Sequence, residues 1–170
     1  MDASYWIKKL NLSIHPEGGY YKEVYRCDEF IETNSLPKRF SRRHTFSTAI
    51  YFLLNGNQIS AFHKLQSDEI WHYYTGSPLM IHILSDKGEY KISKLGLNIE
   101  NGELPQIVIP HNHWFAAELL DKTSFSLMGC TVAPGFDFAD FKFGTKKELI
   151  KKFPLYKDVI SKLSISQKRS

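Results

Sequence analysis

Short segments rich in β-branched and aromatic residues recur along the chain, and turns that contain glycine or asparagine separate them. Such residues favour the half-buried surface of a pleated sheet, and glycine adopts the backbone angles that tight turns need. Many short strands at regular spacing are typical of a β-sandwich or barrel, of which the jelly roll is one form. The predicted strands are 20–26, 45–54, 59–65, 70–74, 79–84, 90–95, 106–109, 114–119 and 124–132.

Helical signals are confined to the two ends of the chain. Asp2 is a suitable N-cap for a helix that reaches Leu10. Thr145 and Glu148 have the spacing of a capping box, in which each side chain satisfies a backbone N–H of the first helical turn. Pro154 ends that helix, further helical turns are predicted to residue 163, and residues 167–170 are expected to be frayed.

One globular domain accounts for the whole chain. The 170 residues are 42% hydrophobic, which is enough to bury a sizeable core. We therefore predict a single domain, 1–170, with a barrel core at about 15–143 and a helical tail at about 145–163. No apolar run reaches the roughly 18 residues of a membrane span, and no secretory leader is visible. Cys27 and Cys130 are expected to be reduced thiols in a cytoplasmic protein.

Charge gives little reason to expect a nucleic-acid partner. The formal net charge is only +4. Four cations gather in the irregular segment 27–44, but one aromatic residue lies among them and no nucleic-acid module surrounds them. This segment is interpreted as a solvated loop, with anion binding near a pocket mouth as the alternative.

The segment 62–76 contains a pair of ionisable residues in an apolar setting. His63 belongs to one predicted strand and Glu69 to the next, with a polar break at 66–68 that predicts a hairpin turn. Because side chains alternate along a strand, His63 and Glu69 are expected to point into the same interior. Two interpretations are open: a hydrogen-bonded pair that satisfies itself in a core, or a functional site.

This segment also resembles the first motif of the cupin superfamily, with His63, Glu69 and Gly76 at the corresponding places. Gly102 and residues 110–115 resemble the second motif. More specifically, the chain is similar to the uncharacterised cupin family known as cupin 5, formerly a domain of unknown function. The matching blocks are 15–21, 47–51, 62–65, 67–72 and 129–138, within about residues 6 to 143.

The resemblance implies a fold more than a reaction. It implies an all-β, cupin-type double-stranded β-helix, a jelly-roll barrel with short terminal helices. The family carries little settled biochemistry. The resemblance, with an apolar N-terminal strand region, also leads us to expect a homodimer.

The places that hold a metal in familiar cupins are only half filled. Leu65 stands where the second histidine would be, and Phe115 where the fourth ligand would be. Metal sites of this kind usually need at least three protein ligands. No cofactor is therefore predicted. A divalent metal is not excluded, and its ligands would be His63, Glu69 and His72, the last only through a β-bulge.

A small-molecule pocket is the expected setting for His63 and Glu69, which are the candidate catalytic residues. Pockets for such ligands are mostly apolar with a few polar groups. Glu23 has two interpretations, a hydrogen-bonding group in the pocket or a residue on a solvated edge. The carboxylates of Asp137 and Asp140 are expected to be solvated. The candidate ligand-binding residues are Trp71, Tyr73, His72, Phe115, Tyr21 and Glu23.

Three functions from different classes follow. The first is a metal-independent isomerase or epimerase that acts on a sugar-like or carbonyl-containing ligand, with His63 as the base. The second is a ligand-binding or sensor protein without turnover. The third is a metal-dependent oxygenase or hydrolase, which Leu65 and Phe115 disfavour.

Overall fold

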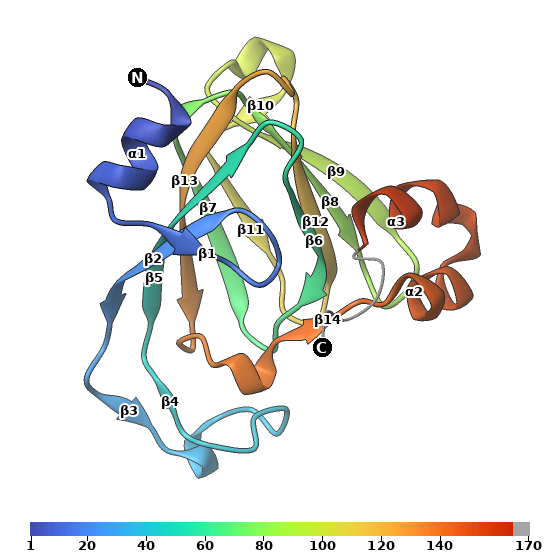
Figure 1. Cartoon of the computed structure of the whole chain (residues 1–170). Helices are drawn as coiled ribbons and strands as arrows, with labels where there is room; N and C mark the ends of the chain where they lie inside the picture. Colours follow the sequence, from blue (N-terminus) through green and yellow to red (C-terminus); the bar gives the residue numbers. More distant parts are fainter. Residues whose placement is uncertain (165–170) are drawn as a thin grey trace.

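The computed structural model describes residues 1–164, which form a jelly-roll barrel of two six-stranded sheets (Figure 1). The strands of the first sheet, in spatial order, are β1 (Ser13–Ile14), β2 (Tyr20–Arg26), β5 (Thr48–Asn55), β13 (Phe125–Ala133), β7 (Asp68–Gly76) and β11 (Gln106–Ile109). Those of the second sheet are β10 (Glu103–Leu104), β9 (Tyr90–Leu95), β8 (Leu79–Leu84), β12 (Trp114–Leu119), β6 (Ile59–Lys64) and β14 (Lys142–Phe143).

The predicted all-β class is confirmed, and every predicted strand overlaps an observed one. The predicted strand 45–54 is divided, however, because Thr45 belongs to β4 (His44–Thr45) in a separate two-stranded sheet and β5 begins at Thr48. The predicted hairpin at 66–68 is wrong. β6 belongs to the second sheet and β7 to the first, so the chain crosses from one sheet to the other between them. β6 is buried along most of its length and pairs with β12 and β14, whereas β7 pairs with β13 and β11. His63 and Glu69 therefore belong to opposite walls of the barrel rather than to neighbouring strands of one sheet.

Short helices pack against the outer faces of the two sheets. α1 (Ala3–Lys9) packs on the first sheet, and α2 (Lys146–Lys152) and α3 (Lys157–Leu163) lie beside the second (Figure 1). Single 3-10 turns are η1 (Thr33–Ser35), η2 (Ile99–Asn101), η3 (Phe138–Asp140) and η4 (Pro154–Tyr156). None of the helices in residues 1–164 is long and apolar enough to span a bilayer.

Both predicted helix caps are confirmed. Asp2 Oδ1 accepts the backbone N–H of Tyr5 at 2.9 Å. Thr145 Oγ1 accepts the N–H of Glu148 at 3.2 Å and donates to that residue's carboxylate at 2.8 Å. The expected fraying of residues 167–170 falls outside the described residues.

The core is divided into three layers of apolar side chains. The largest lies between the sheets and includes Phe52, Trp71 and Phe115. A second layer lies between the second sheet and helices α2 and α3, and a third lies under α1. The layer between the sheets forms the floor of the cavity described below.

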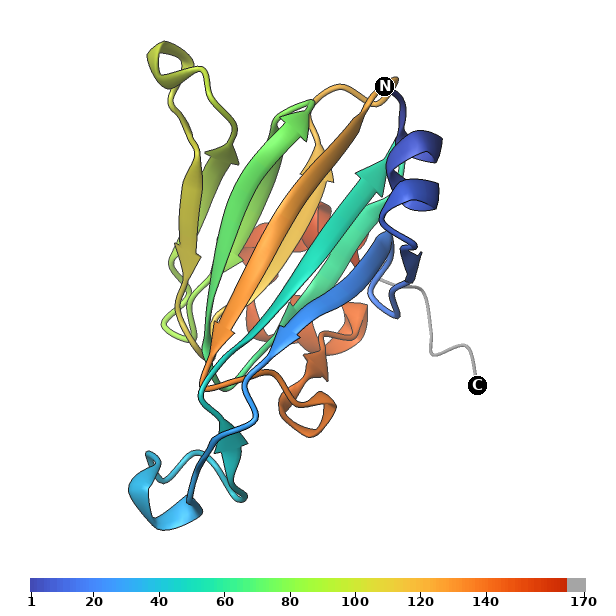
Figure 2. The ribbon, with the colours of Figure 1, turned by 90° about the vertical axis from the view of Figure 1, so that its left-hand side faces the viewer.

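The segment 27–44 projects from one end of the barrel (Figure 2). It carries the short β3 (Phe30–Ile31), which pairs with β4 (His44–Thr45). Arg39 Nε donates to the carbonyl oxygen of Gln66 at 2.7 Å, and the Arg43 guanidinium lies 4.3 Å from the centre of the Phe30 ring. Two of the four cations of this segment are thus engaged with neighbouring groups.

Candidate functional site

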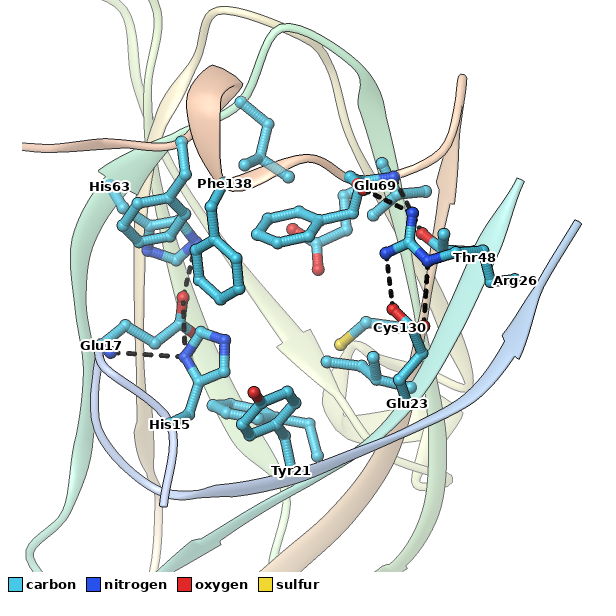
Figure 3. Close-up of a pocket in the computed structure, with 16 residues that line it drawn as sticks. His15, Glu17, Tyr21, Glu23, Arg26, Thr48, His63, Glu69, Cys130 and Phe138 are labelled. Carbon is cyan, nitrogen blue, oxygen red and sulfur yellow. Dashed lines mark hydrogen bonds and ion pairs between the residues drawn. The ribbon is translucent and has the colours of Figure 1, made fainter. Parts of the chain in front are cut away.

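A cavity of about 260 Å³ lies between the two sheets. Its walls come from both sheets, from the turn before β2 and from the loop after β13 (Figure 3). Aromatic and aliphatic side chains make most of the surface, and a few ionisable groups interrupt it. The lining residues are His15, Glu17, Tyr21, Glu23, Arg26, Thr48, Ile50, Phe52, His63, Leu65, Glu69, Cys130, Val132, Phe136, Phe138 and Phe141.

A tight turn brings Glu17 into the interior. The His15 N–H donates to the carbonyl oxygen of Gly19 at 3.0 Å, and Gly18 and Gly19 both have positive φ. The turn lies on β6, where the N–H of Ala61 donates to the carbonyl oxygen of Glu17 at 3.0 Å. This contact places the Glu17 side chain against β6 with only 6% of the residue exposed.

Glu17 and His63 share one proton in an arrangement that their neighbours determine. His63 Nδ1 lies 2.7 Å from the carbonyl oxygen of Ala61, which can only accept, so Nδ1 carries a proton. His63 Nε2 lies 3.1 Å from Glu17 Oε2. The other oxygen of Glu17 accepts from Ser60 Oγ at 2.8 Å. In the neutral pair, Glu17 is therefore a carboxylic acid that donates to Nε2 of a neutral imidazole.

Burial favours this neutral form of the pair. It raises the pKa of Glu17 well above the ordinary value of 4.5, and the nearby Glu69 carboxylate raises it further. Burial lowers the pKa of His63 from 6.5 to about 3, although the bond to the Ala61 carbonyl opposes that change. An ion pair in this position would leave two charges in an apolar interior.

His15 supplies a donor that faces the cavity. Its Nδ1 accepts the backbone N–H of Glu17 at 3.3 Å, so in the neutral ring the proton lies on Nε2. Burial keeps the ring neutral by lowering its pKa to about 4. The ring of Tyr21 packs against it edge-on at 4.5 Å between centres. Figure 3 shows the second ring nitrogen of His15 directed into the cavity.

Glu69 lies across the cavity from this group, on β7 of the first sheet, and its carboxyl points into the cavity (Figure 3). Burial raises its pKa from 4.5 to about 7, while the Trp71 indole and the Cys130 thiol lower it in part. The Trp71 indole and the Cys130 thiol are thus hydrogen-bonding neighbours of the carboxyl, although neither Glu69 Oε2 nor Trp71 Nε1 completes a bond of ordinary geometry among residues 1–164. Glu69 is also one of the lining residues, so its carboxyl is an acceptor at the cavity wall.

Glu23 and Arg26 close one side of the cavity where it meets solvent. Arg26 donates to both carboxylate oxygens of Glu23, at 3.0 and 2.7 Å, and to the carbonyl oxygen of Phe136 at 3.1 Å. The two side chains are 43% and 40% exposed. Both interpretations of Glu23 therefore apply: it is a hydrogen-bonding residue of the cavity lining, and it lies at the solvated edge.

The loop after β13 covers the cavity with aromatic rings and is held at both ends. The Phe136 N–H donates to Thr48 Oγ1 at 2.9 Å. His44 Nδ1 lies 3.1 Å from the Gly135 carbonyl oxygen, and His44 Nε2 lies 3.0 Å from Asp140 Oδ2. The expectation that the Asp140 carboxylate is solvated is therefore wrong, because Asp140 is buried against His44.

Four of the candidate residues proposed from the sequence line the cavity: His63, Glu69, Tyr21 and Glu23. Trp71 and Phe115 lie in the core below it instead, each 1% exposed. The Phe115 ring packs on His63 at 4.0 Å between centres, and Trp71 lies beside Glu69. They support the two ionisable residues from beneath and are not among the lining residues.

The structure does not bring His72 and Tyr73 to the cavity. His72 faces away from the interior, with Nε2 3.2 Å from Thr131 Oγ1 on the neighbouring strand. Tyr73 lies farther along β7, where its hydroxyl donates to the carbonyl oxygen of Gly76. The strand alternation that places Glu69 inside places His72, three residues on, outside.

Sequence reasoning missed several residues of the site, chiefly His15, Glu17, Arg26 and Cys130. In the sequence, His15 and Glu17 stand out only as part of a matching block, and Cys130 only as a reduced thiol within a predicted strand. All three lie in the blocks 15–21 and 129–138 that carry the family resemblance. Those blocks were used as signals of fold, although a histidine and a glutamate flanking a proline before two glycines could have indicated a polar turn with a second role.

The cavity does not fit the metal site of familiar cupins. Leu65 and Phe115 are buried where two donors would be needed, and His72 is turned away. Within residues 1–164, no three histidine, cysteine or acidic side chains are grouped so that they could hold a metal ion.

Proteins of similar sequence and structure exist in distant organisms. The uncharacterized protein YML079W of Saccharomyces cerevisiae is 33% identical over 146 residues, which cover 81% of this chain and 72% of that protein. A hypothetical protein from Leishmania major has 32% identity and a TM-score of 0.90, covering 98% of this chain and 100% of the other. Protein SO0799 from Shewanella oneidensis has 35% identity and a TM-score of 0.89, with 98% and 99% covered.

A more distant likeness concerns the fold alone. Oxalate decarboxylase from Bacillus subtilis has 16% identity and a TM-score of 0.55, and the match covers 91% of this chain but 37% of the decarboxylase. The profile of the family described as "Cupin superfamily (DUF985)" matches residues 4–144. With the double-stranded barrel and full-length relatives of the same fold, this match means that the chain belongs to that cupin family.

Proposed function

We propose that the protein binds a small carbonyl compound and transfers a proton at the carbon next to the carbonyl, as a metal-independent isomerase or epimerase. One observation carries the proposal. A buried carboxyl, Glu69, faces a proton-carrying pair, Glu17 and His63, across an apolar cavity. Two carboxyl groups in one site whose environments keep them in different protonation states are the usual arrangement of an acid and a base.

Each group has a distinct part in the proposed reaction. The carbonyl oxygen of the substrate accepts a hydrogen bond from His15 Nε2–H. Glu69 removes the proton from the adjacent carbon, and the electron pair of that C–H bond forms the C=C bond of an enol-like intermediate. His15 stabilises the negative charge that develops on oxygen. A pKa of about 7 suits the base, because it is ionised near neutral pH and still basic.

The proton can return from either wall. Return from Glu69 to the former carbonyl carbon gives an isomer, because the hydroxyl oxygen on the deprotonated carbon forms the new C=O bond and its proton passes to the former carbonyl oxygen. Return from the opposite wall, where Glu17 holds a proton on Oε2, gives the epimer at the same carbon. His63 thus has a different role from the one expected from the sequence. In this proposal it holds the Glu17 proton in place, and Glu69 is the base.

Solvent exchange of substrate protons tests this proposal. In D₂O, wild-type protein is expected to accelerate loss of the α-proton NMR signals of hydroxyacetone, 2-hydroxycyclohexanone or 2-hydroxyacetophenone. Glu69→Gln should lower that rate by about 10²- to 10⁴-fold, the usual contribution of a general base. The wild-type rate should also rise with pH through about 7, because Glu69 acts only as the carboxylate.

Glu103→Gln is the matched control, because Glu103 is also a buried glutamate but lies outside the cavity. The Glu103→Gln variant should catalyse exchange of the substrate α-protons at the wild-type rate. An equal rate in Glu69→Gln, or no acceleration by wild type, would reject proton transfer. Saturable binding without exchange would then favour the alternative, a ligand-binding or sensor protein.

The proposal also includes activity without a tightly held metal. His63 Nε2 faces Glu17 and Leu65 is aliphatic, so the positions around His63 offer too few free donors for a transition metal. Exchange activity is expected to survive dialysis against EDTA, with substoichiometric metal in the purified protein by elemental analysis. One equivalent of metal that resists EDTA and is lost in His63→Ala would favour a metal-dependent oxygenase or hydrolase instead.

A homodimer and a cytoplasmic location stay predictions from the sequence. Exposed apolar side chains on the first sheet, including Tyr25, Tyr74 and Val108, support the dimer. Two free cysteines support a reducing compartment.

A further inference from the structure

We infer that the cavity selects an uncharged hydroxy-carbonyl compound with one flat apolar ring, and that Glu23 is the residue that excludes anions. This inference rests on the proposed function and adds the class of substrate. It depends on three features of the cavity: the aromatic lining, the hydrogen-bonding groups and the neutralised cation.

The size and lining of the cavity define the body of the ligand. About 260 Å³ lies just below the roughly 300–1,000 Å³ of pockets for drug-sized ligands, so one ring with short substituents fits and a sugar nucleotide does not. Phenylalanine rings from the covering loop and from β5 face this space. Phe138 is one of these lining residues, so its ring can stack on a flat ligand. A free sugar would place several hydroxyls against these rings without partners.

Two polar groups define what the ligand must carry. Glu69 is 93% buried, since 7% of it is exposed, and its carboxyl is an acceptor in the cavity lining, so it favours a ligand that brings a hydrogen-bond donor. His15 Nε2–H is a donor, because Nδ1 already accepts from the Glu17 backbone. A ligand hydroxyl that donates to Glu69 and a ligand carbonyl that accepts from His15 would meet both requirements. Glu17 already has Ser60 and His63 as hydrogen-bonding partners, so it needs none from the ligand.

Charge at the cavity excludes anionic ligands. Among the lining residues that the structure describes, Arg26 is the sole permanent cation. Its guanidinium is engaged by both oxygens of Glu23 and by the Phe136 carbonyl. The remaining ionisable groups of the lining are Glu17, Glu69, Cys130, Tyr21 and two histidines, and none of them offers a free positive charge near neutral pH. A carboxylate or phosphate would meet Glu69 and Glu23 without a free cation.

Binding of four related probes tests the inference without requiring turnover. The probes are 2-hydroxyacetophenone, acetophenone without the hydroxyl, hydroxyacetone without the ring, and phenylglyoxylate with a carboxylate. Isothermal titration at pH 8 is expected to give saturable binding of 2-hydroxyacetophenone. Acetophenone and hydroxyacetone should bind about tenfold or more weakly, since each lacks one favourable contact. Phenylglyoxylate should bind at least about a hundredfold more weakly.

A single variant should reverse the exclusion of anions. Glu23→Gln removes the charge that neutralises Arg26, so the affinity for phenylglyoxylate relative to that for 2-hydroxyacetophenone should rise by about tenfold or more. Glu100→Gln, an exposed glutamate outside the lining, should change neither affinity.

Three results would overturn the inference. The first is that phenylglyoxylate binds to wild type as tightly as 2-hydroxyacetophenone does. The second is that 2-hydroxyacetophenone shows no binding up to 10 mM, roughly the weakest affinity that titration resolves. The third is that Glu23→Gln shows no gain of anion binding relative to that of 2-hydroxyacetophenone. The proposed function fails separately. Glu69-dependent proton exchange with a reversed binding order would keep the reaction and reject the substrate class.

Discussion

Glu69→Gln is expected to stabilise the protein by about 3 kcal/mol at pH 8.5 and to leave its stability nearly unchanged at pH 4. The pKa of Glu69 is raised from 4.5 to about 7, chiefly by burial. The folded protein thus holds this proton more tightly than the unfolded chain does. The associated stability is fully present below pH 4.5 and is lost as the pH rises through about 7. Each unit of pKa difference corresponds to about 1.4 kcal/mol, which gives the expected magnitude.

Urea denaturation of wild type and variant at several pH values between 4 and 8.5 measures this effect as a difference in unfolding free energy. Loss of the Glu69 charge removes one of the causes that raise the pKa of Glu17, but burial, the larger cause, is present in both proteins and keeps Glu17 protonated. The gain from Glu69→Gln should appear between about pH 4.5 and pH 7, since Gln is nearly isosteric with the neutral carboxyl group.

Glu118→Gln should have the opposite sign and is the matched control. Burial acts to raise the pKa of Glu118, but Lys122 and Lys162, each 2.7 Å from its carboxylate, hold it below the ordinary value. Its ionised form therefore stabilises the fold above pH 4.5, and the amide should destabilise there. If both variants changed stability in the same direction at pH 8.5, the charge environment assigned to Glu69 would be wrong.

Gly18→Ala is expected to destabilise the protein by more than about 3 kcal/mol and to remove ligand binding. Gly18 has a φ of +112°, and a Cβ there would collide with the carbonyl oxygen of Ile59. Positive φ alone costs an L-residue about 1–2 kcal/mol. The collision adds to this cost, because the turn must move away from β6 and the bond from the Ala61 N–H to the Glu17 carbonyl is then lost.

Gly88→Ala separates the two contributions. Gly88 also has a positive φ, +86°, but a Cβ there would meet nothing within 4 Å. It should therefore cost only the backbone strain, about 1–2 kcal/mol, and leave ligand binding intact. Thermal and urea unfolding of both variants compares them. Equal losses of stability would show that contact with Ile59 contributes nothing.

The strands and the helix caps could be predicted because each depends on local residue patterns. Thr145 and Glu148, for example, lie three residues apart in one helical turn and need no distant partner. The sheet to which a strand belongs is different. The residues between His63 and Glu69 have the composition of a turn whether the next strand pairs with β6 or crosses to the other sheet, and only the distant strands β12 and β13 decide this.

The candidate site was predicted in part for the same reason. His63 and Glu69 could be found because strand alternation places both inside. Glu17 could not, because its role depends on contact of the 15–19 turn with Ser60 and Ala61, and Ser60 lies 43 residues from Glu17 in the sequence. Trp71 and Phe115 have the same inward phase as the lining residues, but sequence alternation carries no information on depth below the cavity.

The aromatic core between the sheets has a consequence for how this site can change. Phe52 and Trp71 of the first sheet, with centres 5.7 Å apart, continue through Phe115, 6.3 Å from Trp71, to His63 of the second sheet at 4.0 Å. These rings act as a spacer that sets the gap between Glu69 on one wall and the Glu17–His63 pair on the other. A larger or smaller side chain at Phe115 or Trp71 would therefore change the width of the cavity while these three ionisable residues are kept. Under the proposed function, the accepted size of substrate can thus evolve through core residues that do not line the cavity.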